Sequence, residues 1–112
     1  MSQVSASQIA VTALAALDKK LDVTANNIAN VNTDEFKKSR AVFQTEEVPG
    51  VSVTIERVDT PGTENLDGVE SSNVDLAEEI VDLITTQHSY TANVKVIETA
   101  GKMQKTLIDI LA

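Results

Sequence analysis

Residues 76–97, LAEEIVDLITTQHSYTANVKVI, place large side chains at alternating intervals of three and four residues. The positions of this C-terminal seam are Leu76, Ile80, Leu83, Gln87, Tyr90, Val94 and Ile97. That spacing is typical of helices that pack along their length. Asp75 and Glu78 predict a capping box at the start. With no break before Leu111, we expect a C-terminal helix roughly 55 Å long.

The N-terminal part of the chain repeats the same pattern. Its seam consists of Leu14, Leu17, Leu21, Thr24, Ile28 and Val31. Ser5 and Gln8 predict a capping box at the start, and the periodicity continues to about Asn32. Two interpretations of the asparagines remain open. Either Asn32 ends the helix in a left-handed conformation, or the other amides bond across to backbone or neighbouring chains and fix the register.

A second apolar seam lies on the C-terminal helix. It comprises Val96, Ala100, Met103, Leu107 and Ile110. Because two seams on one helix need more than one covering partner, the pattern indicates assembly. Gly101 lies four residues after Ile97 inside this helix. It is either a tolerated defect or a point where a neighbouring helix approaches closely.

The middle of the chain has a different pattern. Residues 51–56 alternate as in a half-buried strand, and residues 42–45 are a plausible partner strand. Pro49-Gly50 predicts the turn between them, Pro61-Gly62 the end of the second strand, and residues 63–72 a loop. The predicted fold is therefore mainly α with a small β insert. Its parts are a core helix over 1–33, a connector and β-rich insert over 34–72, and a core helix over 73–112, forming one structural unit.

Composition and charge restrict the possible partners. Three residues are aromatic, so a dense globular core is not expected. The net charge is −8, and residues 41–72 hold seven acids against one base. We therefore expect an outward-facing, solvated insert and neither a nucleic-acid partner nor direct membrane insertion. The chain has no cysteine, and no basic residue precedes the first apolar stretch. If the protein leaves the cytoplasm, we expect it to do so without a cleavable signal peptide.

Catalytic chemistry finds little support in the sequence. His88 is the single histidine, and position 85, where a Glu-x-x-His pair would need a carboxylate, is threonine. Glu78, Glu79 and Asp82 fall where acids favour the helix dipole. The four glycines do not cluster into a phosphate loop. We expect no catalytic, cofactor-binding or metal-binding residues and no enzyme.

Two motifs resemble those of the bacterial flagellar rod and hook proteins. Residues 25–33, ANNIANVNT, followed by Phe36-Lys37, resemble the N-terminal motif of that family. Residues 72–79, SNVDLAEE, with Gln87, Tyr90, Asn93 and Met103 after them, resemble its C-terminal motif. The chain departs from the family in having Glu35 where a glycine usually precedes the Phe, which puts the usual tight turn in doubt. Its insert is also shorter than in distal-rod and hook proteins, so its length is closer to the proximal rod proteins.

The resemblance implies a structural subunit of the flagellar axial structure, most consistent with the rod, that self-assembles through its terminal helices and transmits torque. The partners would be copies of itself, other rod and hook subunits, and the flagellar type III export apparatus, and the location would be the basal body. A soluble helical oligomer that acts as an adaptor or chaperone for axial proteins is the alternative. The predicted assembly interface comprises Leu14, Leu17, Leu21, Asn27, Ile28, Asn30, Val31, Leu76, Ile80, Leu83, Tyr90, Val94, Ile97, Gly101, Leu107, Ile108 and Leu111.

Overall fold

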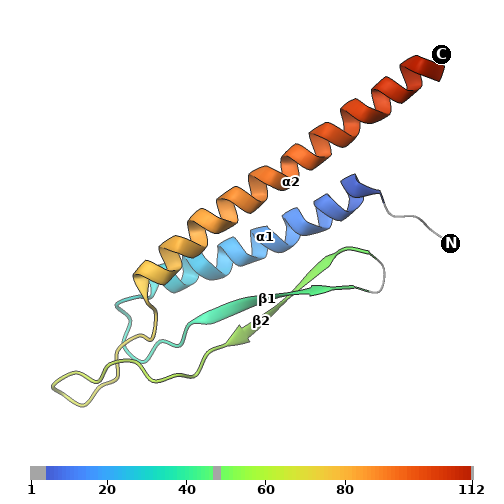
Figure 1. Ribbon diagram of the computed structural model, residues 1–112. Helices are drawn as coiled ribbons and strands as arrows, with labels where there is room; N and C mark the ends of the chain where they lie inside the picture. The colour runs from blue at the N-terminus through green and yellow to red at the C-terminus, as the bar shows by residue number, and fades with distance from the viewer. Residues whose placement is uncertain (1–4, 47–48, 112) are drawn as a thin grey trace.

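The computed structural model describes residues 5–46 and 49–111. Helix α1 spans Ala6–Ala29, strands β1 and β2 span Ser39–Thr45 and Val51–Arg57, and helix α2 spans Leu76–Leu111. Helix α1 lies between α2 and the hairpin, so the three parts form layers (Figure 1). The predicted mainly helical fold with a small β insert is confirmed.

Helix α1 begins as predicted but ends early. The Ser5 side chain accepts a hydrogen bond from the Gln8 backbone, and the Gln8 side chain accepts one from the Ser5 backbone. These two bonds confirm the capping box. The helix ends at Ala29, and Asn30 caps it with φ −107°. The Asn30 amide donates to the carbonyl and side-chain oxygens of Asn26 (2.9 and 2.8 Å). Because Asn30 closes the helix, the prediction that Asn32 does so in a left-handed conformation is wrong.

Helix α2 runs unbroken for 36 residues, as its pattern predicts. The Asp75 side chain accepts from the Ala77 backbone (3.1 Å) and so caps the first turn. Glu78, the other half of the predicted capping box, lies 3.9 Å from the Lys38 ammonium instead. The C-terminal part of α2 extends past the start of α1, where nothing in the described part of the chain covers it (Figure 1).

The hairpin is antiparallel and pairs Ser39 with Arg57 through Thr45 with Val51. Its first strand starts three residues before the predicted Val42. The second strand ends at Arg57, well before the predicted Pro61-Gly62. The Val58 backbone still donates to the Lys38 carbonyl (2.9 Å), and beyond the strand the Asn73 side-chain amide donates to the carbonyls of Val58 and Thr60 (both 2.9 Å). Thr12 of α1 accepts from the Val51 backbone (3.0 Å) and fixes the hairpin on α1.

The chain has little core of its own. Among the described residues, the buried apolar side chains are Ala10, Ala16, Leu17 and Val23. The molecule measures 75 × 27 × 13 Å and has a radius of gyration of 19.4 Å. A compact domain of this length has a radius of about 13 Å. The expectation that no dense globular core forms is therefore confirmed. Neither helix, over its described residues, has an apolar stretch long enough to cross a membrane.

Candidate assembly surface

The predicted N-terminal seam lies along α1, apart from Val31 in the turn that follows the helix, and is unevenly covered. Leu17 and Thr24 are buried, and Leu14, Ile28 and Val31 are half-buried. Leu21 keeps 43% of its surface exposed. A second row of buried residues, Ala16, Val23 and Asn27, is offset from this seam. The hairpin packs there, because Ala16 lies beside Val51 and Val53 of β2.

Helix α2 turns a largely polar face toward α1. Its buried residues are Glu79 and Thr86, each 4% exposed. Asn93, two helical turns after Thr86, is half-buried. Within the predicted C-terminal seam, Leu83 and Ile97 are half-buried. The remaining apolar members keep more than a third of their surface exposed: Leu76, Ile80, Tyr90 and Val94. The positions that α2 buries within the chain are therefore offset by about one residue from this seam, which was predicted to pack either within the chain or between chains.

The exposed apolar side chains of α2 form two stripes on different sides of the helix. The first stripe consists of Leu76, Ile80, Ile84 and Val94, and the second of Val96, Met103, Leu107 and Ile110. Ile108 and Leu111, 64% and 77% exposed, complete the uncovered end. The seam analysis omitted Ile84, which is 51% exposed. The sequence signal for Ile84 was the pair of adjacent apolar residues Leu83-Ile84, because such a pair makes an apolar stripe wider than a single seam.

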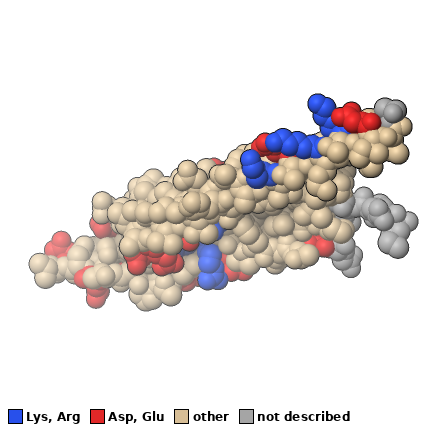
Figure 2. All heavy atoms as spheres, turned by 45° about the horizontal axis from the view of Figure 1, so that its top comes forward, with Lys and Arg blue, Asp and Glu red and all other residues tan. Residues whose placement is uncertain are grey.

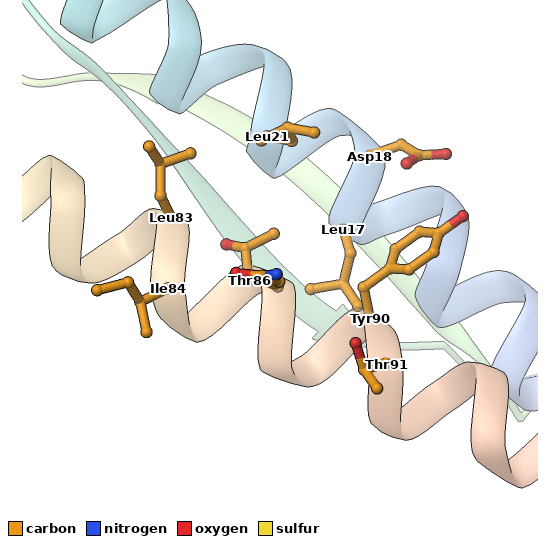
Figure 3. Close-up of a pocket in the computed structure, with 9 residues that line it drawn as sticks. Leu17, Asp18, Leu21, Leu83, Ile84, Thr86, Tyr90 and Thr91 are labelled. Atoms are coloured by element: carbon orange, nitrogen blue, oxygen red, sulfur yellow. The ribbon is translucent and has the colours of Figure 1, made fainter.

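Two grooves run beside these stripes. The first, of ≈ 470 Å³, lies between the helices and is lined by Leu17, Leu21, Leu83, Ile84 and Tyr90, with Asp18 on its wall (Figure 3). Thr86 also lines it, and its hydroxyl is the buried side-chain oxygen without a partner among the described residues. The second groove, of ≈ 960 Å³, lies where α1 begins and α2 continues past it. An unpaired buried hydroxyl and large apolar linings are features that a neighbouring chain would satisfy.

The Asn27 side chain of α1 joins three elements, because it bonds residues of β1 and α2. Its side-chain nitrogen donates to the Ser39 carbonyl (2.9 Å) and to Glu79 Oε1 (3.2 Å), and its oxygen accepts from the Ser39 backbone (3.0 Å). The interpretation that an asparagine amide bonds across to other backbone is thus confirmed at Asn27, within the chain. Burial raises the pKa of the Glu79 carboxyl, and the bond from Asn27 opposes that shift. Glu79 lies in the first turn of α2, as the helix-dipole expectation requires, and is at the same time a buried member of this junction.

A second network holds the connector that leads into α2. Asn73 accepts from the Lys38 backbone (2.7 Å) while its amide bonds the 58–60 segment. Glu70 pairs with Lys37 and accepts from the Gly62 backbone (2.8 Å). The Lys37 bond, followed by the Gly62 bond, lowers the pKa of Glu70. These roles of Asn73 and Glu70 were not predicted, because their partners are distant in the sequence.

Two positions in the same connector have a tightly constrained backbone, Glu35 and Gly62. Glu35, in place of the glycine usual in the motif, adopts φ 63° and donates its backbone N–H to the Glu70 carbonyl (2.7 Å). The tight turn therefore persists with a non-glycine residue. A Cβ on Gly62 would lie 2.0 Å from the Ser71 carbonyl oxygen, so only glycine fits there.

The other residues named from the sequence lie on the α2 surface. His88 is exposed. A Cβ on Gly101 would meet nothing within 4 Å, so no close helix approach occurs there within the described chain. Acidic side chains gather at the end of the molecule that carries the 63–70 loop, and lysines lie along the overhanging part of α2 (Figure 2).

Comparisons with known proteins agree with this arrangement. Residues 8–37 match the family described as flagella basal body rod protein, and residues 68–110 match the C-terminal part of the flagellar basal body rod FlgEFG proteins. The flagellar basal-body rod protein FlgC of Salmonella typhimurium is 34% identical over 88% of this chain and 91% of its own length. FlgC of Yersinia enterocolitica is 32% identical over 96% of this chain and 97% of its own. The flagellar hook protein FlgE of Rhizobium meliloti is 45% identical, over 38% of this chain and 10% of that protein.

Proposed function

The chain belongs to the family of flagellar basal-body rod and hook proteins and is a structural axial subunit, and from this premise we propose that it is a rod subunit of the FlgC type. The extent of the similarity supports the choice of rod over hook. FlgC relatives align over nearly their whole length, whereas the hook relative aligns over a tenth of its own. The short insert between the terminal helices is consistent with the same choice.

We further propose that copies of this chain and other axial subunits cover the two stripes of α2. The observation that carries this proposal is that α2 leaves apolar side chains exposed on two sides, while over the described part of the chain the buried apolar side chains are Ala10, Ala16, Leu17 and Val23. A soluble protein rarely keeps apolar surface of this extent uncovered. The proposed interface keeps the predicted residues, to which Ile84 is added.

The junction at Asn27 is suited to a subunit that must resist mechanical force. It connects α1, β1 and α2 through bonds that satisfy both the amide and the Glu79 carboxylate. Such a junction resists sliding of one helix along the other, which a rod that transmits torque requires. We propose that the subunit acts in the basal body, after export through the flagellar type III apparatus without a cleavable signal peptide.

The test replaces exposed apolar residues of the first stripe in the native gene. Ile80→Ser with Ile84→Ser should leave the fold of the chain intact, because both side chains are about half exposed in it. We expect loss of motility and of the subunit from purified basal bodies, with secretion retained. Thr85→Ser with His88→Gln, at exposed polar positions of the same helix, is the matched control.

Mass spectrometry of purified basal bodies distinguishes a rod subunit from the alternative, an adaptor or chaperone for axial proteins. A wild-type subunit that is absent from them, while being needed for their formation, would be an adaptor or chaperone. Normal motility of the Ile80/Ile84 variant would contradict the proposed interface.

A further inference from the structure

The loop over residues 63–70 presents a leucine on a fixed turn. Leu66 is fully exposed, at 107% of its reference surface. The Asn65 backbone donates to the Val69 carbonyl (2.9 Å), and the Asn65 side-chain oxygen accepts from the backbones of Asp67 and Val69 (both 3.1 Å). Gly68 closes the turn at φ 77°. Because these bonds fix the backbone of the turn, little backbone freedom is lost when a partner covers the leucine.

The second groove lies at the other end of the molecule. Its apolar lining comes from Ala6 of α1 and from Ala100, Met103, Leu107 and Ile110 of α2, and Lys102 stands at its edge. Its volume of ≈ 960 Å³ holds a leucine side chain together with the turn that carries it. Loop and groove lie toward opposite ends of a molecule 75 Å long, so they cannot meet within one chain (Figure 1).

Charge selects this groove over the first one. Leu66 stands between Glu64 and Asp67 in the sequence, and the second groove has Lys102 at its edge with Lys105 one turn away. The first groove has Asp18 on its wall, which repels an acidic loop. Lys102 contacts Glu98 (3.1 Å), but this exposed pair contributes little and yields readily to a new partner.

We propose that the 63–70 loop of one copy inserts Leu66 into the second groove of another copy, so that subunits contact head to tail. This inference rests on the proposed self-assembling rod subunit and names one contact within it. Because the two surfaces differ, each copy offers both, and the contact continues along an open series of subunits rather than closing a pair.

The absence of cysteine from the sequence allows a direct test in the full chain. Assembled Leu66→Cys, Met103→Cys protein is oxidised mildly and examined on a non-reducing gel. A disulfide needs Cα atoms within about 7 Å, so a ladder of dimers, trimers and longer products reports the contact. Each single variant can give dimers at most. The matched control is Leu66→Cys with Ile84→Cys, since Ile84 is also exposed but lines the first groove.

Electron microscopy of the same samples separates the possible failures. Assembled particles without a ladder, or a ladder confined to the Ile84 control, would overturn the Leu66 contact and leave the rod assignment standing. Failure of the wild-type chain to assemble with itself or with other axial subunits would overturn the proposed function and this contact with it. A second readout is the critical concentration. We expect Leu66→Ser to raise it about tenfold and Leu66→Met to restore it.

Discussion

At the scale of single residues, Glu35 holds a conformation that glycine adopts at lower cost. Its φ of 63° places Cβ against the following carbonyl, which costs about 1–2 kcal/mol for a non-glycine residue. Glu35→Gly removes that cost but adds freedom to the unfolded chain, so we predict a net stabilisation of about 1 kcal/mol. Urea unfolding followed by circular dichroism measures it. Glu35→Ala removes the same carboxylate while keeping Cβ, and an equal gain there would show that charge, not backbone strain, is responsible.

Glu79 predicts a dependence of stability on pH. Burial raises the pKa of its carboxyl, with Asp82 and Glu78 adding to the shift and Asn27 and Lys38 opposing it. The folded state therefore binds the proton more tightly than the unfolded chain. The stabilisation is complete below the unfolded pKa of about 4.3 and is lost as the pH rises through the raised folded value.

Glu79→Gln keeps an oxygen for the Asn27 amide without the buried charge. We predict that it is more stable than wild type at neutral pH and that the difference shrinks toward about pH 4. Unfolding midpoints of both proteins across this range are the measurement. A difference that stays constant with pH would mean that packing, rather than the charge, separates them.

Asn27→Ala should destabilise the chain by about 1–3 kcal/mol at every pH, because Ser39 and Glu79 lose partners.

At the scale of elements, Gly101 tests where a neighbouring helix lies. A Cβ at this position meets no atom of the described chain within 4 Å. Gly101→Ala should therefore strengthen α2 by about 1 kcal/mol through helix propensity alone. We predict weaker incorporation into the rod despite the stronger helix, because Gly101 belongs to the proposed interface. Helicity and incorporation measured on one variant decide it, and incorporation that holds or rises would remove Gly101 from the interface.

The elements themselves could be predicted from the sequence, but the orientation of α2 could not. Sequence periodicity predicted both helices, and both are present. On α1 it also predicted part of the packing face, because Leu17 and Thr24 of the N-terminal seam are buried. On α2 the same reasoning found an apolar seam that could pack within the chain or between chains. Within the chain, α2 buries Glu79 and Thr86, and Asn27 supplies a partner for Glu79 across the helix pair. Sequence periodicity finds apolar stripes; it does not say whether a stripe faces its own chain or another one.

The connector was less predictable for a related reason. The side chains that hold it, Asn73 and Glu70, bond partners more than eight residues away or backbone groups with no sequence signature. The motif containing Asn73 could be recognised from the sequence, whereas the bonds of its side chain to Lys38, Val58 and Thr60 depend on the fold.

At the scale of the whole molecule, an extended shape with few buried apolar residues predicts concentration-dependent stability. Association that buries the α2 stripes stabilises the folded state by mass action, so the melting temperature should rise with protein concentration. Calorimetry over a hundredfold concentration range measures the effect. The Ile80→Ser, Ile84→Ser variant is the control, and its melting temperature should change less with concentration. A wild-type melting temperature independent of concentration would mean that the single chain is self-sufficient.

The small buried set also bears on how such a chain moves through a narrow passage. Between Ser5 and Leu111, leaving out residues 47–48, the buried apolar side chains are Ala10, Ala16, Leu17 and Val23, so we expect little mechanical work to be needed to unfold a single subunit. On the proposed route of export and assembly, we expect a free subunit to unfold at low force and a subunit covered by neighbours on both sides of α2 to resist unfolding. Incorporation would then act as a one-way step, because the chain is easily unfolded before arrival and hard to extract once its neighbours enclose it.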